Sequence, residues 1–145
     1  MKEANKVIAL KFLNALCAGD VATLKTVVTD DVVAIMPGSA QISGTRHYPE
    51  IMAVCATFPR ISSNGLNPKV LNLTAEDDRV SLEWEGNCTL INGQQYNNHY
   101  HFLMFFRDEK VCRMKEYLDT KLADDMLIPV MASVLAQGQN RTEAT

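Results

Sequence analysis

A single carboxylate interrupts the apolar side of the last predicted strand. In segment 110–119 one side of the strand is mixed and basic, and the other consists of Cys112, Met114, Glu116 and Leu118. Because successive side chains of a strand point to opposite faces, this pattern turns Glu116 toward the core. A carboxyl group in that setting must pair, accept hydrogen bonds or hold a proton with a raised pKa, which suits a general acid or base near neutral pH. A structural ion pair with a helix Lys or Arg is the alternative.

The strand predicted at 79–91 has one polar and one apolar side. The even positions are mainly apolar and include Trp84, whereas the odd positions are Ser81, Glu83, Glu85, Asn87 and Thr89. Composition alone favours a polar side that faces water and a Trp84 side that faces the core. In the alternative, the polar side lines a pocket inside a bent sheet, and the Trp84 side packs on the outside against a second subunit.

The turn after this strand predicts its partners. Asn92-Gly93 between two alternating runs is a strong signal for a two-residue hairpin turn. With that turn, Glu85 lies opposite Tyr100 and Asn87 lies opposite Asn98. These four side chains, with Tyr96 nearby, would form a polar group on one side of the sheet.

The turn into the last strand leaves two alternatives open. A two-residue turn at Asp108-Glu109 sets Glu116 opposite His101. An odd-length turn or a bulge sets Glu116 opposite Tyr100. A one-residue slip of this kind moves every side chain of the strand to the other face.

Other motifs do not favour a metal or a cofactor. His99 and His101 share one face of a strand, but no third ligand stands at a suitable spacing, so we interpret that face as polar or as an interface. The four cysteines, Cys17, Cys55, Cys88 and Cys112, are widely spaced and form no CxxC pair, so we predict reduced and buried thiols. The sequence has no GxGxxG, P-loop or GxSxG motif. We expect no metal and no cofactor.

Length and charge narrow the class of protein. The chain has 145 residues and a net charge of −3, which matches one globular domain without the basic surface of a nucleic-acid binder. The N-terminal segment is typical of an amphipathic helix rather than a signal peptide, and the apolar stretch 126–136 is too short to cross a membrane. We predict a cytoplasmic protein with one domain at 1–137 and a disordered tail at 138–145.

The order of predicted elements indicates an α+β fold. Helices and strands are segregated along the chain, so the helices must cover one face of a strongly bent antiparallel sheet. Helices are predicted at 2–18 and 21–28, from Gly44 to Pro59, and from about Lys121 with a break at Pro129; strands are predicted at 32–36, 68–75, 79–91, 95–107 and 110–119.

The segments from Asn92 to Tyr100 and from Lys110 to Thr120 resemble the SnoaL-like family, and the resemblance covers nearly the whole chain. That family is related to polyketide cyclases and ketosteroid isomerases within the nuclear transport factor 2-like superfamily. The resemblance implies a cone-shaped, cystatin-like α+β barrel with its N-terminal helices packed in a curved sheet, an apolar pocket and a homodimer. It also implies that the odd side of 79–91 and Tyr100 line the pocket with Glu116, and we adopt that assignment.

These observations together predict an enzyme that isomerises, cyclises or dehydrates a small apolar, polycyclic substrate. Glu116 would act as general acid or base, Glu85 would assist it, and Tyr100 would donate a hydrogen bond to a developing oxyanion. Asn98 and Asn87 would orient polar substituents of the substrate. The apolar wall would consist of Phe12, Leu16, Ile35, Phe102, Met114 and Leu118. The alternative is a non-catalytic ligand-binding or dimerisation module of the same fold.

Overall fold

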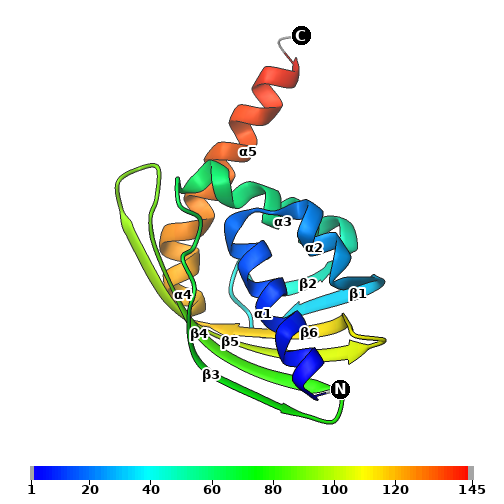
Figure 1. Cartoon of the computed structure of the whole chain (residues 1–145). Coiled ribbons are helices and arrows are strands. Elements are labelled where there is room, and N and C mark those ends of the chain that lie inside the picture. The colour runs from blue at the N-terminus through cyan, green and yellow to red at the C-terminus, as the bar shows by residue number, and fades with distance from the viewer. Residues whose placement is uncertain (1, 144–145) are drawn as a thin grey trace.

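The computed structural model describes the backbone of residues 2–143 and the side chains of residues 2–137 (Figure 1). The elements follow in the order α1 (Lys2–Ala18), α2 (Val21–Thr26), β1 (Val28–Met36), β2 (Gly44–His47), α3 (Tyr48–Ile61), β3 (Lys69–Glu76), β4 (Arg79–Thr89), β5 (Gln95–Arg107), β6 (Lys110–Leu118), α4 (Thr120–Leu122), the π-helical turn η1 (Ala123–Leu127) and α5 (Ile128–Glu143). The predicted α+β class is confirmed.

The strands form one curved sheet in the order β2-β1-β6-β5-β4-β3. Neighbouring strands are antiparallel except β1 and β6, which are parallel, so the prediction of a wholly antiparallel sheet is wrong at that one contact. Helices α1, α2 and α3 lie on one side of this sheet (Figure 1). The first strand in the chain, β1, thus lies beside the last, β6.

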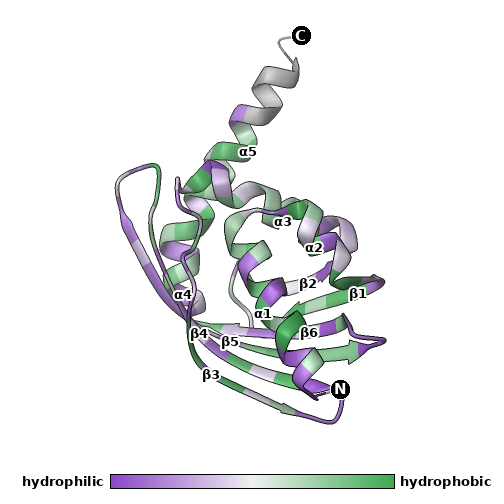
Figure 2. Cartoon of the chain, in the orientation of Figure 1, coloured by the Kyte–Doolittle hydropathy of each residue, from purple (hydrophilic) through white to green (hydrophobic). Residues whose placement is uncertain are grey.

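The core lies between the helices and the concave side of the sheet. Colouring by hydropathy shows polar and apolar residues alternating along the strands (Figure 2). The even residues of β4 and β5 are buried, among them Leu82, Trp84, Phe102 and Met104. Composition therefore predicted the faces of β4 correctly, and the face assignment adopted from the family resemblance is wrong.

The segment that begins at Gly44 is a strand before it is a helix. Arg46 pairs with Ala34 of β1, and the helix α3 starts only at Tyr48 with Pro49 in its first turn. The pairing supplies backbone hydrogen bonds that a short local pattern does not reveal. The prediction of a helix from Gly44 is wrong for these first four residues.

The C-terminal helix is interrupted where Pro129 predicts a break. The π-helical turn η1 ends at Leu127, directly before α5, and proline cannot donate the backbone hydrogen bond that a regular helix needs. The backbone of α5 continues to Glu143. The side chains of 138–143 and residues 144–145 lie outside the described part, so the domain limit at 137 and the disordered tail at 138–145 stay predictions.

Candidate functional site

An apolar cavity of about 90 Å³ lies between the helices and the concave side of the sheet. Its wall comes from α1, α3, the C-terminal segment η1 and α5, and the strands β1, β2, β4, β5 and β6. The polar groups in this wall belong to Arg46, Trp84, Tyr100 and Glu116. Such a cavity, apolar with a few polar groups, is the usual form of a small-molecule site.

Glu116 reaches the cavity because β6 contains a bulge. The turn at Asp108-Glu109 has two residues, both with positive φ, and it pairs Arg107 with Lys110. One step further the register shifts, so that Phe105 pairs with Arg113 and Phe102 pairs with Glu116. Both alternatives predicted for the partner of Glu116, His101 and Tyr100, are therefore wrong.

The extra residue of the bulge keeps the apolar side of β6 facing inward. Val111 and Met114 are both buried, and Cys112 between them is only half-buried, with its Sγ donating to the carbonyl oxygen of Phe105 over 3.4 Å. An unbulged strand would have set Glu116 opposite His101, whose side chain lies on the outer face. A bulge adds one residue to one strand and re-aims the side chains beyond it.

Burial governs the ionisation of Glu116. The residue is half-buried, and it belongs to the cavity wall. Desolvation by the surrounding apolar groups raises the pKa of Glu116 from 4.5 to about 7, and the positive charge of Arg46 acts in the opposite direction. Arg46 and Glu116 form no ion pair in the described part of the chain.

Arg46 is a cavity residue that the sequence analysis missed. Its Nη2 donates to the carbonyl oxygen of Ile42 over 2.7 Å, while its Nη1 is buried without a partner among the described residues. The register that places Arg46 beside Ala34, another cavity residue, explains its position. A strand prediction for Gly44–His47 would have drawn attention to Arg46.

The hairpin between β4 and β5 has a three-residue turn rather than the predicted two. The amide of Leu90 donates to the carbonyl oxygen of Gln94, and Gly93 adopts a positive φ of 87°. This is the three-residue hairpin in which a glycine occupies the left-handed position. One extra turn residue sets Trp84, not Glu85, opposite Tyr100.

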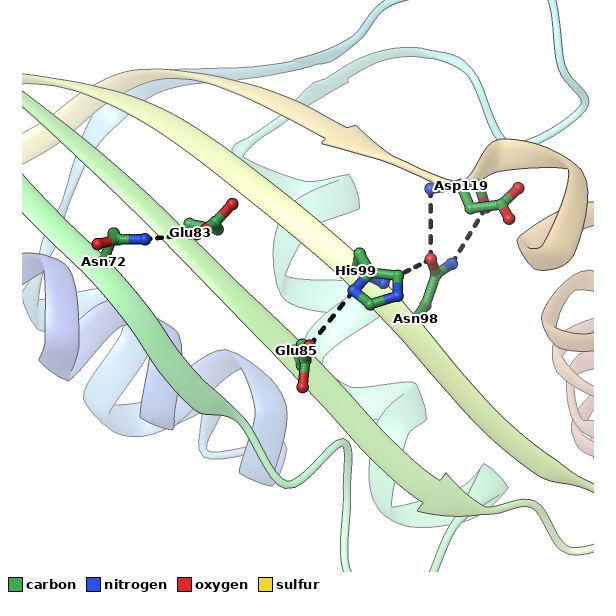
Figure 3. A network of polar contacts seen from close by, with 6 residues as sticks. All are labelled: Asn72, Glu83, Glu85, Asn98, His99 and Asp119. Atoms are coloured by element: carbon green, nitrogen blue, oxygen red, sulfur yellow. Dashed lines mark hydrogen bonds and ion pairs between the residues drawn. The ribbon is translucent and has the colours of Figure 1, made fainter.

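Glu85 and Asn87 consequently lie on the outer face of the sheet. Glu85 pairs with His99 Nδ1 at 3.5 Å (Figure 3). Asn87 lies opposite Asn97. Glu83 on the same face accepts a hydrogen bond from Asn72 over 2.6 Å. The prediction that Glu85 assists Glu116 and that Asn87 orients a substrate is wrong, because the sheet separates both residues from the cavity.

Tyr100 lies in the cavity wall, held by aromatic and polar contacts. Its ring stacks on Trp84 with centroids 4.0 Å apart and planes 7° apart. Its hydroxyl lies 3.1 Å from the hydroxyl of Tyr96, which accepts a hydrogen bond from Asn98 Nδ2 over 2.8 Å. Burial raises the pKa of Tyr100 well above its usual range, so the phenol keeps its proton.

Asn98 is buried but does not line the cavity. Its Nδ2 donates to the carbonyl oxygen of Asp119 over 3.1 Å, and its Oδ1 accepts from the Asp119 amide over 3.3 Å (Figure 3). Asn98 therefore ties β5 to the start of α4. The prediction that Asn98 contacts substrate is wrong, because its amide is used within the fold.

The predicted apolar wall is present with one exception. Phe12, Leu16, Phe102, Met114 and Leu118 line the cavity. Ile35 does not, because the even residues of β1 point inward, and those in the wall are Ala34 and Met36. The sequence analysis also missed the part of the wall from η1 and α5, formed by Leu127, Ile128 and Met131.

The histidines do not gather into a metal site in the described residues. His101 Nε2 lies 2.7 Å from Ser81 Oγ, and His99 pairs with Glu85, both on the outer face. Within residues 2–137 no three His, Cys, Asp or Glu side chains come together in a metal-binding arrangement. None of the described helices is long and apolar enough to cross a membrane.

A strongly curved sheet that encloses helices and one apolar cavity defines the nuclear transport factor 2-like, or cystatin-like, class of α+β folds, and solved structures described in these terms and as ketosteroid isomerase-like share the fold of this chain. Within that class the chain belongs to the SnoaL-like domain family, whose profile matches residues 9–114. No curated protein matches the chain.

Three solved structures illustrate the likeness. PrhC from Penicillium brasilianum is 15% identical with a TM-score of 0.75, covering 95% of this chain and 91% of its own. Bal32a from a soil-derived mobile gene cassette is 19% identical with a TM-score of 0.74, covering 86% and 96%. TerC, co-crystallised with polyporic acid, is 20% identical with a TM-score of 0.68, covering 81% and 93%. At these identities the likeness shows the fold alone.

Proposed function

We propose that this chain is an acid–base enzyme of the isomerase, cyclase or dehydratase type that acts on a small apolar substrate without a cofactor. The observation that carries the proposal is the lone carboxyl group of Glu116 in the wall of an apolar cavity. With a pKa raised to about 7, this group can both accept and donate a proton at neutral pH.

Tyr100 is the hydrogen-bond donor in this proposal. Asn98 donates to the Tyr96 hydroxyl, which leaves the proton of Tyr96 for the oxygen of Tyr100. The proton of Tyr100 can then point at an oxygen of the substrate. As Glu116 removes a proton from carbon, negative charge develops on that oxygen, and a fixed donor stabilises it.

The size of the cavity limits the substrate. The space of about 90 Å³ is smaller than the roughly 300–1,000 Å³ of sites for drug-sized ligands. A polycyclic substrate therefore requires the cavity wall to move outward. A smaller apolar substrate needs less rearrangement.

The test is a metabolite panel screened by thermal shift and then by turnover. Compounds that raise the melting temperature of the wild type are incubated with wild type, Glu116→Gln and the matched control Glu85→Gln. We expect turnover in the wild type and in Glu85→Gln, and none in Glu116→Gln. Full turnover in Glu116→Gln would refute the assignment of Glu116 as the catalytic group.

The second candidate is a binding module without catalysis. It is favoured by the finding that Glu116 is the one carboxylate in the described cavity wall, since Glu85 lies outside. A module would retain its ligand unchanged. Recovery of every stabilising compound in unaltered form would favour the module over the enzyme.

We also propose a homodimer formed by the outer face of the sheet. Apolar side chains remain partly exposed on that face in neighbouring strands, namely Val33, Ile35, Leu103, Phe105 and Tyr117. Burying them against a second copy would remove apolar surface from water. Sedimentation at micromolar concentration is expected to give a dimer, and a monomer would refute this proposal.

A cytoplasmic location fits the state of the thiols. Cys17, Cys55, Cys88 and Cys112 are all free. The first three are buried, whereas Cys112 is only half-buried, so the prediction of four buried thiols is wrong for Cys112. Disulfides are rare in reducing compartments and common in secreted proteins. Fractionation of cells that produce the protein is the direct measurement, and recovery from a secreted fraction would contradict this location.

A further inference from the structure

Arg46 is the feature of the cavity that acid–base chemistry at Glu116 does not use. It projects from the edge strand β2 into a wall that is otherwise almost wholly apolar. A guanidinium group is always charged and carries five donors. Placing such a group in apolar surroundings is unfavourable unless its donors are satisfied.

Only part of this guanidinium is satisfied within the fold. Nη2 donates to the carbonyl oxygen of Ile42 over 2.7 Å, which fixes the orientation of the planar group. Nη1 is buried and has no partner among the described residues. The indole Nε1 of Trp84, a cavity residue that is 1% exposed, likewise has no partner. Two residues of the wall, Arg46 and Trp84, therefore each carry a buried donor without an acceptor among the described residues.

The charges around Arg46 leave room for an anion. The charged or titratable side chains in the cavity wall are Arg46, Glu116 and Tyr100, and no ion pair joins the first two in the described residues. Asp124 of η1 lies nearby, but both of its carboxylate oxygens accept from backbone amides, those of Gln41 and Ile42, over 2.8 and 2.9 Å. An external carboxylate would thus be the first acidic group to form an ion pair with Arg46 among the described residues.

We propose that the cavity binds an apolar ligand carrying one carboxylate or similar anionic oxygen group, and that the guanidinium group of Arg46 binds this group. This inference rests on the proposed function, because it names the substrate class of the same cavity. Arg46 is then the residue that distinguishes acids from neutral molecules of the same shape. A planar guanidinium suits this role because it matches the geometry of a carboxylate.

Glu116 makes this recognition dependent on pH. Below its pKa of about 7, Glu116 is neutral and leaves the charge of Arg46 to the ligand. Above that pH, the Glu116 carboxylate repels the ligand anion and attracts Arg46. Between pH 6 and pH 8 we expect the affinity for an acid to fall by up to about tenfold, in proportion to the neutral fraction of Glu116.

The experiment compares two acids with their uncharged isosteres. Benzoate and benzamide form one pair, and isobutyrate and isobutyramide form a smaller pair suited to the size of the cavity. Titration calorimetry at pH 6 is expected to show each carboxylate binding at least about tenfold more tightly than its amide. Arg46→Gln removes this preference, whereas the control Arg113→Gln, an exposed arginine of the outer face, retains it.

Three results would overturn the inference. They are equal affinity for acid and amide in the wild type, an unchanged preference in folded Arg46→Gln, and no binding of either carboxylate up to its solubility. If Arg46→Gln does not fold, Arg46→Lys is tested in its place. This variant keeps the positive charge but lacks the planar guanidinium group, so we expect it to lose most of the preference for acid over amide. Glu116→Gln is expected to bind the acids with little pH dependence.

These measurements separate the inference from the proposed function. Neither probe is required to react, so acid binding by Arg46 stands even if Glu116→Gln retains turnover. Conversely, an enzyme that loses turnover in Glu116→Gln but binds acid and amide equally would keep the proposed function and refute the role of Arg46.

Discussion

Glu116 of β6 lies directly opposite Phe102 of the adjacent strand β5, so the one acidic side chain that the described residues bring to the cavity has an aromatic side chain as its cross-strand neighbour. The bulge between the turn and this pair produces the register. It gives Glu116 the same inward face as Met114 and Leu118. The ionisation of the site therefore depends on the geometry of the strand pair as well as on the residue itself.

Glu116→Gln is expected to change how stability depends on pH. Because the folded state raises the pKa of Glu116 from 4.5 to about 7, the folded wild type binds a proton that the unfolded chain has released. This bound proton stabilises the folded state fully below pH 4.5, and the stabilisation is lost as the pH rises through about 7. Between pH 5 and pH 8 the free energy of unfolding should therefore fall by about 2–3 kcal/mol less in Glu116→Gln than in the wild type.

Urea denaturation at the two pH values measures this difference. Glu85→Gln, the same change on the outer face, is the control and should follow the wild type. A Glu116→Gln protein that is strongly destabilised at both pH values would instead identify Glu116 as a structural partner of Arg46.

Asn98→Ala should destabilise the fold by about 2–3 kcal/mol. The change removes a buried amide that bonds to Tyr96 and to both backbone groups of Asp119. Asn97→Ala, at the exposed neighbouring position, should change the free energy of unfolding by less than about 0.5 kcal/mol. Chemical denaturation monitors both variants, and equal effects would show that the amide of Asn98 is dispensable.

Gly86→Ala should disturb the aromatic stack of the cavity. An added Cβ would lie 3.1 Å from Trp84 Cζ3, 3.2 Å from the Leu66 carbonyl oxygen and 3.3 Å from Tyr100 Cε2. We expect the free energy of unfolding to fall by about 1–3 kcal/mol. Because the chain has one tryptophan, Trp84, its fluorescence should change as well. Asn87→Ala, which points outward, is the control. An unchanged emission spectrum in Gly86→Ala would mean that the stack tolerates the methyl group.

Asp124→Ala should loosen the loop that carries Ile42. Its carboxylate accepts hydrogen bonds from the amides of Gln41 and Ile42, so these amides should exchange with solvent faster in the variant. Asp125→Ala, which removes only an exposed pair with Lys121, is the matched control. Hydrogen exchange followed by NMR distinguishes the two, and unaltered exchange at Ile42 would show that other contacts hold the loop.

The types and order of most elements follow from local patterns in the sequence. Period-two alternation predicts β3 to β6 to within a few residues, and it places Glu116 with Met114 and Leu118. Pro129 predicts the interruption of the last helix. These features are determined locally because side-chain alternation and proline geometry act over a few neighbouring residues.

The tertiary structure decided which side chains lie opposite one another on neighbouring strands. One extra residue in the turn at Gly93 exchanges Glu85 for Trp84 opposite Tyr100, and the bulge at Cys112 brings Glu116 to Phe102. The short strand that carries Arg46 exists because β1 supplies its hydrogen bonds. The length of a turn, the place of a bulge and the pairing of an edge strand depend on how the whole apolar face is buried. The free energy of that burial comes from many residues far apart in the chain, so a local sequence pattern does not predict it.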